Sequence, residues 1–119
     1  MRYVDGYLLS VPNERLAEYK KIASKAGKVW LEHGALQYCE CAGDDMSTPC
    51  GVPFTKAAKT KERETTIFAF IVYKSRRHRD QVNAKVMKDE RLKDMVDPKN
   101  PPFDMKRMAF SGFKTLVDL

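Results

Sequence analysis

Two acidic residues of this chain fall within predicted strands, where acids are uncommon, and each has a tyrosine nearby at strand spacing. Asp5 lies between Tyr3 and Tyr7, and Glu40 follows Tyr38 by two positions. Alternate residues of a strand project from one face, so each carboxylate is predicted to share a face with a phenol. A carboxylate shielded by apolar walls has a raised pKa and can remove a proton from a phenolic or enolic substrate. This pattern indicates a base for cofactor-free chemistry.

A structural role is the alternative interpretation of the same acids, and the sequence favours it. In that interpretation, Asp5 or Glu40 forms an ion pair with Arg2, Arg107 or a second subunit at the edge of an interface. The side chains predicted to line a ligand pocket are those of Tyr3, Tyr7, Tyr38 and Phe70.

Three arginines, Arg76, Arg77 and Arg79, crowd the first turn of a predicted helix. Cations are unfavourable beside the positive end of a helix dipole, by about 0.3 to 1 kcal/mol each. An anionic ligand or an acidic loop such as Asp44-Asp45 would offset that cost, because helix N-termini bind phosphate and carboxylate groups. The alternative is that the three side chains extend into solvent.

The cysteines and histidines favour neither a metal nor a cofactor. Cys39 and Cys41 are predicted to project from one strand face, where a disulfide between them would be strained, so they and Cys50 are expected to be free thiols. His33 and His78 fall at helix ends and are not directed into a sheet cavity, which argues against a haem site. No cofactor is predicted.

Composition and motifs exclude several classes of protein. The sequence has no P-loop, dinucleotide-binding glycine fingerprint, nucleophile elbow or paired zinc-ligand motif. The net charge of +6 is spread along the helices without interleaved aromatic residues, so nucleic-acid binding is not favoured. No apolar run is long enough for a membrane span, and the N-terminus does not resemble a signal peptide, so a soluble cytoplasmic protein is expected.

Hydrophobic periodicity predicts an α+β protein in which residues 1–119 form a single domain. Strands alternate apolar positions with period two, whereas the helices repeat them every three or four residues. The predicted order is strand, helix, strand, strand, helix, strand, over residues 3–11, 13–33, 35–42, 66–73, 75–89 and 107–116. This βαββαβ order is that of a ferredoxin-like fold, with a four-stranded antiparallel sheet and two helices on one face. Ser75 is the expected N-cap of the second helix, and a short helical turn is expected after Pro53.

The strand over residues 66–73 is apolar on both faces. Phe68, Phe70 and Val72 alternate with Ile67, Ala69, Ile71 and Tyr73. Two helices cover only one face of a small sheet, so the other face needs a second subunit or a large ligand.

Several segments together resemble the YbaA-like family of unknown function: Gly34-Ala35-Leu36, residues 40–45, Phe70-Ile71-Val72-Tyr73, residues 79–87 and residues 102–108. The resemblance implies membership of the dimeric α/β-barrel superfamily, in which two ferredoxin-like sheets pack face to face. Phe70 stands where relatives are expected to have Trp.

Three hypotheses about function follow. The first is a homodimer that binds a small, partly apolar molecule in the cavity between the sheets. The second is a cofactor-independent enzyme of the monooxygenase or isomerase type, using Asp5 or Glu40 with Tyr7 or Tyr38. The third is a protein-interaction module whose basic helix ends bind an acidic partner.

Overall fold

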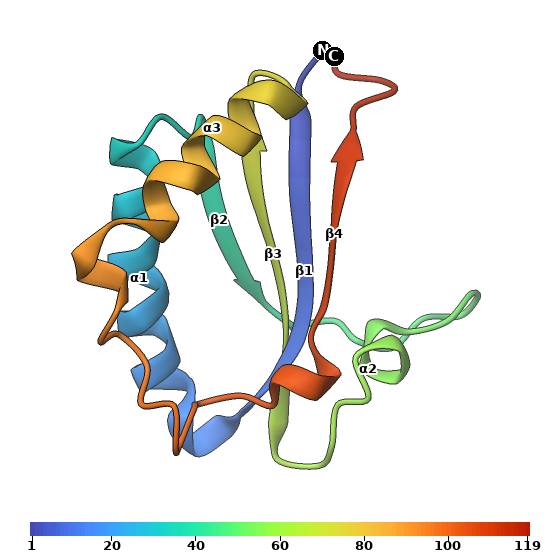
Figure 1. Cartoon of the computed structure of the whole chain (residues 1–119). Helices are drawn as coiled ribbons and strands as arrows, with labels where there is room; N and C mark the ends of the chain where they lie inside the picture. Colours follow the sequence, from blue (N-terminus) through green and yellow to red (C-terminus); the bar gives the residue numbers. More distant parts are fainter.

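The computed structural model describes all 119 residues and contains one four-stranded sheet with two long helices on one face (Figure 1). The elements are β1 (Tyr3–Pro12), α1 (Leu16–Glu32), β2 (Gln37–Ala42), the short α2 (Phe54–Ala57), β3 (Glu64–Tyr73), α3 (Arg76–Met87) and β4 (Ala109–Lys114). Single 3-10 turns occur at residues 13–15, 90–92 and 105–107. The predicted α+β architecture with a four-stranded antiparallel sheet is therefore confirmed, as is the short helical turn after Pro53.

The sheet has the strand order β2-β3-β1-β4, and every neighbouring pair is antiparallel. Its central strands β3 and β1 pair along their whole length, from Tyr3 opposite Tyr73 to Pro12 opposite Glu64. One row across the sheet places Ala69 of β3 between Tyr7 of β1 and Glu40 of β2. This α+β architecture is compatible with a ferredoxin-like fold.

Local sequence signals set the helix ends. The Ser75 hydroxyl accepts a hydrogen bond from the backbone N–H of His78 at 3.1 Å, so Ser75 is the N-cap of α3 as predicted. Gly34 follows the end of α1 with a φ of +115°, a conformation that L side chains rarely adopt. The chain can therefore turn sharply from α1 into β2.

The core consists of two groups of buried side chains between the helices and the sheet. The first contains Tyr3, Val29, Ala35, Ile71, Tyr73, Val82 and Val86. The second contains Leu9, Val11, Tyr19, Ala23, Ile67 and Ala69. Tyr7 is only partly buried and packs against both groups, so it marks the place where they meet.

The other face of the sheet has no helix over its centre. Strand alternation and the pairing register assign to it Val4, Gly6, Leu8, Cys39, Cys41, Phe68, Phe70, Val72, Ala109, Ser111 and Phe113. None of these side chains is charged. The same alternation adds Ser10, Pro12, Gln37, Thr66 and Glu64, so the one strand acid on this face, Glu64, lies at the start of β3 and is paired with Arg107. Phe68 remains 43% exposed and Phe113 58% exposed. The sequence correctly predicted that β3 is apolar on both faces, and we call this second surface the open face.

The last strand is shorter than predicted. It spans Ala109–Lys114 rather than residues 107–116, because the preceding residues form a 3-10 turn capped by Asp104. Arg107 ends this turn, and its guanidinium binds both carboxylate oxygens of Glu64 at 2.7 Å. The side chain that was expected to begin a strand instead fastens the turn to β3.

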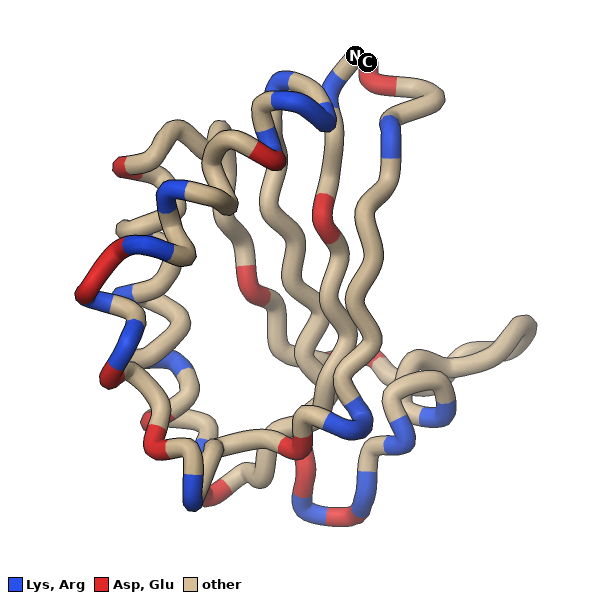
Figure 2. The backbone as a smooth tube through the Cα atoms, viewed as in Figure 1, with Lys and Arg blue, Asp and Glu red and all other residues tan.

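Charged residues are concentrated on the helices and connections, and the strands carry few of them within the sheet (Figure 2). Neither long helix combines the length and hydrophobicity needed to cross a membrane.

Candidate functional site

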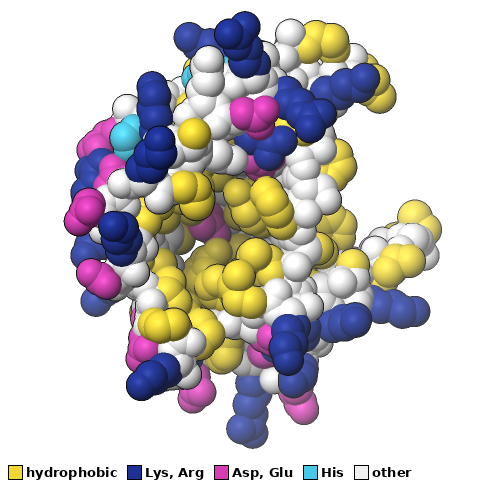
Figure 3. All heavy atoms as spheres, in the orientation of Figure 1, with side chains coloured by type: hydrophobic (Ala, Val, Ile, Leu, Met, Phe, Trp, Pro, Cys, Tyr) yellow, Lys and Arg dark blue, Asp and Glu magenta, His cyan; other side chains and the backbone are white.

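A chamber of about 190 Å³ lies between α1 and the helix-covered face of the sheet. Its principal lining side chains are Tyr7, Tyr19, Trp30, Tyr38, Glu40 and Phe103. They come from β1, α1, β2 and the connection between α3 and β4, so four separate segments build the walls. Figure 3 shows this side of the molecule as a hollow with apolar walls and an acidic side chain deep within it.

Two small residues make room for the chamber and its tyrosines. Ala69 is the β3 residue between Tyr7 and Glu40, where a larger side chain would fill the space. On α1, a Cβ added at Gly27 would lie 2.6 Å from a ring carbon of Tyr38. Gly27 therefore lets the Tyr38 ring approach the helix backbone.

Glu40 is held by two phenols. Tyr19 donates a hydrogen bond to its Oε1 at 2.5 Å, and Tyr38 donates to its Oε2 at 2.7 Å. Burial and the neighbouring Glu40 carboxylate raise the pKa of both tyrosines, so both hydroxyls remain protonated donors. Burial, with the charge of Asp5, likewise raises the pKa of Tyr7. The chamber thus combines one carboxylate with neutral aromatic walls.

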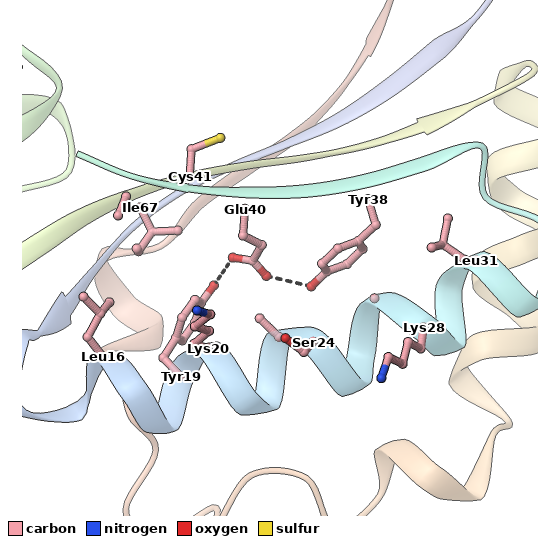
Figure 4. A pocket seen from close by; sticks show the side chains of 13 residues that line it. Leu16, Tyr19, Lys20, Ser24, Lys28, Leu31, Tyr38, Glu40, Cys41 and Ile67 are labelled. Carbon is pink, nitrogen blue, oxygen red and sulfur yellow. Dashed lines mark hydrogen bonds between the residues drawn. The ribbon is translucent and has the colours of Figure 1, made fainter. Parts of the chain in front are cut away.

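A wider groove of about 580 Å³ runs along the outside of the chamber, between α1 and the edge strand β2 (Figure 4). Lys20, Ser24 and Lys28 line it from α1. The groove shares Tyr19, Tyr38 and Glu40 with the chamber, so the Glu40 carboxylate lies where the two spaces meet. Although two lysines line the groove, the hydrogen-bond partners of this carboxylate are the two phenols, and it forms no salt bridge.

Asp5 occupies a separate, closed position beneath α3. Its side chain is 0% exposed, and Arg79 Nη1 lies 3.4 Å from Oδ1. Neither carboxylate oxygen has a hydrogen bond of normal geometry, although Asn83 and Tyr73 lie nearby. Burial raises the pKa of Asp5, and the positive charge of Arg79 opposes that shift. The Asp5 side chain does not line the chamber, whereas Glu40, the other predicted base, does.

The predicted ligand-binding residues divide between three places. Tyr7 and Tyr38 line the chamber. Tyr3 lies under α3, where the Arg79 guanidinium is 4.9 Å from its ring centroid. Phe70 borders the chamber, but the strand register places its side chain on the open face, near Phe68. The three tyrosines are therefore on the helix-covered face, not in a space between two open faces. The sequence could not predict this, because strand alternation fixes which residues share a face but not which face the helices cover.

The arginines also differ from their predicted arrangement. Arg79 turns inward to Asp5 and to Asp80 at 3.1 Å, whereas Arg76 and Arg77 are exposed, so the three do not converge on one anion.

The ion pairs proposed as the structural alternative have other partners. Arg2 is 3.6 Å from Asp118, and Arg107 binds Glu64. Asp5 and Glu40 therefore pair with neither Arg2 nor Arg107.

The histidines lie outside the chamber, and Cys39 borders it although the strand register places its side chain on the open face. His33 Nε2 is 2.8 Å from Asp89, and His78 Nδ1 accepts a hydrogen bond from the backbone N–H of Lys74. Cys39 and Cys41 share the open face, as predicted, with their Sγ atoms 3.7 Å apart. These two cysteines and Cys50 are free thiols.

Sequence reasoning missed Tyr19 and Trp30 as site residues, because both fit the apolar stripe of a packed helix. Their hydroxyl and indole N–H groups could have indicated a polar site nearby, since a buried phenol or indole requires a hydrogen-bond partner. Tyr19 finds Glu40, and the Trp30 indole N–H donates to Asn83 at 3.1 Å.

The fold and site define an α+β protein with a four-stranded antiparallel sheet and a chamber under its helices. The chain belongs to the family described as "Protein of unknown function (DUF1428)", which matches residues 2–105. It is 37% identical to the "Uncharacterized protein YbaA" of Escherichia coli K12 over 118 residues, covering 99% of each chain. The YbaA protein of Shigella flexneri matches at the same identity and coverage. The family resemblance seen in the sequence is thus confirmed.

A solved structure, protein Atu4242 from Agrobacterium tumefaciens, has a similar fold. It superimposes with a TM-score of 0.55 at 14% sequence identity, covering 96% of this chain and 92% of that one. At this identity the likeness concerns the fold alone.

Proposed function

We propose that this protein is a cytoplasmic homodimer that binds a small, partly apolar molecule in the chamber between α1 and the sheet. One observation carries the proposal: an apolar space in the core contains a single charged side chain, Glu40, oriented by two phenols. The three free thiols are consistent with a reducing compartment.

The chamber has the properties of a small-molecule site. Its volume of about 190 Å³ equals that of about six water molecules at the bulk value of about 30 Å³ each. Such sites combine mostly apolar walls with a few fixed polar groups that orient the ligand. Glu40, Tyr19 and Tyr38 provide those polar groups, and their mutual hydrogen bonds hold them in position before a ligand arrives.

The open face supports the dimer. Its strands, about 4.8 Å apart and six to ten residues long, give it about 400 to 600 Å² in projection. The segment before β3 extends this apolar surface with Val52 and with Phe54, whose ring centroid is 5.9 Å from that of Phe68. In Figure 1 the same segment projects away from the body of the molecule. The enlarged surface approaches the roughly 800 Å² per partner of a stable interface. The middle of the open face carries no charged side chain, which favours a second identical face as its partner.

A second candidate is a cofactor-independent enzyme in which Glu40 removes a proton from the bound molecule and Tyr38 stabilises the product. The observation that favours it is the contact between Glu40 and two phenols that are themselves proton donors. Asp5 is too enclosed to act on a ligand in the chamber. Turnover of a ligand without added metal or flavin, abolished in Glu40→Gln, would distinguish this enzyme from a binding protein.

Ligand binding is tested with the single tryptophan, because Trp30 lines the chamber and reports its occupancy by fluorescence. Native mass spectrometry of freshly purified protein is the first measurement, and titration with small neutral alcohols is the second. Ala69→Leu fills the chamber and is expected to abolish both the retained mass and the titration. The matched control Ala84→Leu, on the exposed side of α3, is expected to leave both unchanged. Equal binding by wild type and Ala69→Leu would place the ligand elsewhere and refute the proposed site.

The dimer is tested by sedimentation equilibrium at micromolar concentration. Phe68→Glu introduces a charge at the centre of the open face and is expected to yield folded monomers. Met87→Glu changes an apolar residue of α3 that is more exposed than Phe68, at 68% against 43%, and the variant is expected to remain dimeric. A monomeric wild type would refute the proposed assembly.

A further inference from the structure

We propose that the chamber selects a small organic cation, of the alkylated or methylated ammonium class, over a neutral molecule of the same shape. The inference rests on the proposed binding function and specifies the chemical class of its ligand.

Aromatic rings form much of the chamber wall. The rings of Tyr7, Tyr19, Trp30 and Tyr38 border one chamber and come from three different elements. The faces of such rings carry negative electrostatic potential and attract cations, and tryptophan attracts them most strongly. Trp30 and Tyr38 have ring centroids 6.1 Å apart and are inclined at 40°, so they form two neighbouring walls. The hydrogen bond from the Trp30 indole to Asn83 fixes the first of these walls.

The negative charge of Glu40 has no positively charged partner in the chamber. Glu40 is the only charged residue that lines the chamber. Its two hydrogen-bond partners are neutral phenols, and a carboxylate can accept about four hydrogen bonds. Both carboxylate oxygens can therefore accept a further hydrogen bond from an ammonium N–H. A fully methylated ammonium group has no N–H and would be bound to Glu40 by the attraction of opposite charges alone. A neutral ligand could donate a hydrogen bond to Glu40 but would gain neither the attraction between opposite charges nor the cation–π contact.

The basic residues nearby lie in the outer groove and not in the chamber. Figure 4 shows Lys20 and Lys28 on α1, with the amino group of Lys28 directed away from Glu40. They disfavour a cation in the groove, whereas the hollow in Figure 3 is walled by apolar side chains. We therefore place the ligand on the Trp30 side of Glu40.

The experiment compares choline with its uncharged isostere 3,3-dimethylbutan-1-ol by isothermal titration calorimetry and Trp30 fluorescence. Wild-type protein is expected to bind choline about tenfold more tightly, because one desolvated cation–π contact and one carboxylate each contribute. Glu40→Gln is expected to weaken choline binding by about tenfold and to change binding of the alcohol by less than about twofold. Glu62→Gln removes the same charge from an exposed loop and is expected to change neither.

The outcomes separate this inference from the proposed function. If the alcohol binds wild type as tightly as choline, the cation preference is refuted while the chamber remains a small-molecule site. If neither compound binds and Ala69→Leu also leaves retained ligands unchanged, both proposals are refuted. If choline binds equally well to wild type and a folded Glu40→Gln variant, the role of Glu40 is refuted. The wild-type comparison decides the preference even where the variant does not fold.

Discussion

Replacing Gly27 by alanine tests the construction of the site through two opposing effects. Gly27 lies within α1, where alanine is intrinsically favoured over glycine by about 1 kcal/mol. Helix propensity alone therefore predicts a more stable protein. The structure predicts the opposite, because the new Cβ would lie 2.6, 2.9 and 3.1 Å from three ring carbons of Tyr38.

The size of the destabilisation depends on which part of Tyr38 the new Cβ displaces. The nearest carbons include Cγ, at the base of the ring, so the clash displaces the whole ring and not only its tip. Overpacking of this kind costs about 1 to 3 kcal/mol. A displaced ring also loses its 2.7 Å hydrogen bond to Glu40, and bonds to charged groups contribute about 1.5 to 3 kcal/mol. After subtraction of the gain of about 1 kcal/mol from helix propensity, the free energy of unfolding is expected to fall by about 1.5 to 5 kcal/mol.

The assay is urea unfolding at one fixed protein concentration, since dissociation of a dimer would make stability depend on concentration. Ser24→Ala, an exposed position on the same helix, is the control for propensity and is expected to stabilise by a few tenths of a kcal/mol. In a Tyr38→Ala background, Gly27→Ala is expected to stabilise, because the clash is gone. A stabilised Gly27→Ala single variant would show that Tyr38 does not pack on the α1 backbone and would remove the basis for the arrangement around Glu40.

Two further predictions concern pH. Hydrogen bonds from Arg107 are the main cause that lowers the pKa of Glu64 from 4.5 to about 2, so the pair stabilises the protein above pH 4.5 and less as the pH falls toward 2. Arg107→Gln is expected to lower the unfolding free energy at neutral pH by about 1.5 to 3 kcal/mol and to have a smaller effect near pH 2; an equal loss at both pH values would contradict the pairing. Burial raises the pKa of Asp5 above 3.8, so its contribution to stability is fully present below pH 3.8 and is lost as the pH rises through the raised pKa. As the pH rises, wild type loses this contribution and Asp5→Asn does not, so the free energy of unfolding of the variant is expected to increase relative to that of wild type. A parallel pH dependence of the two proteins would show that Asp5 has an ordinary pKa.

Short-range patterns in the sequence determined much of this architecture. Period-two alternation placed Phe68 and Phe70 opposite Ile67 and Ile71, and the pairing register agrees with that division. Ser75 caps α3 because its hydroxyl lies only three residues before His78, whose backbone N–H donates to it. Such features depend on neighbours in the chain and can be read without knowing where distant segments lie.

Only the tertiary structure decided which face the helices cover and which distant side chains meet. Tyr19 and Glu40 are 21 positions apart, and nothing in the spacing of either residue reveals the other. Arg79, expected at the surface, turns inward because Asp5 is enclosed on the face that α3 covers. Alternation gives two equivalent faces to every strand, and packing of the helices makes one of them the chamber wall and leaves the other open.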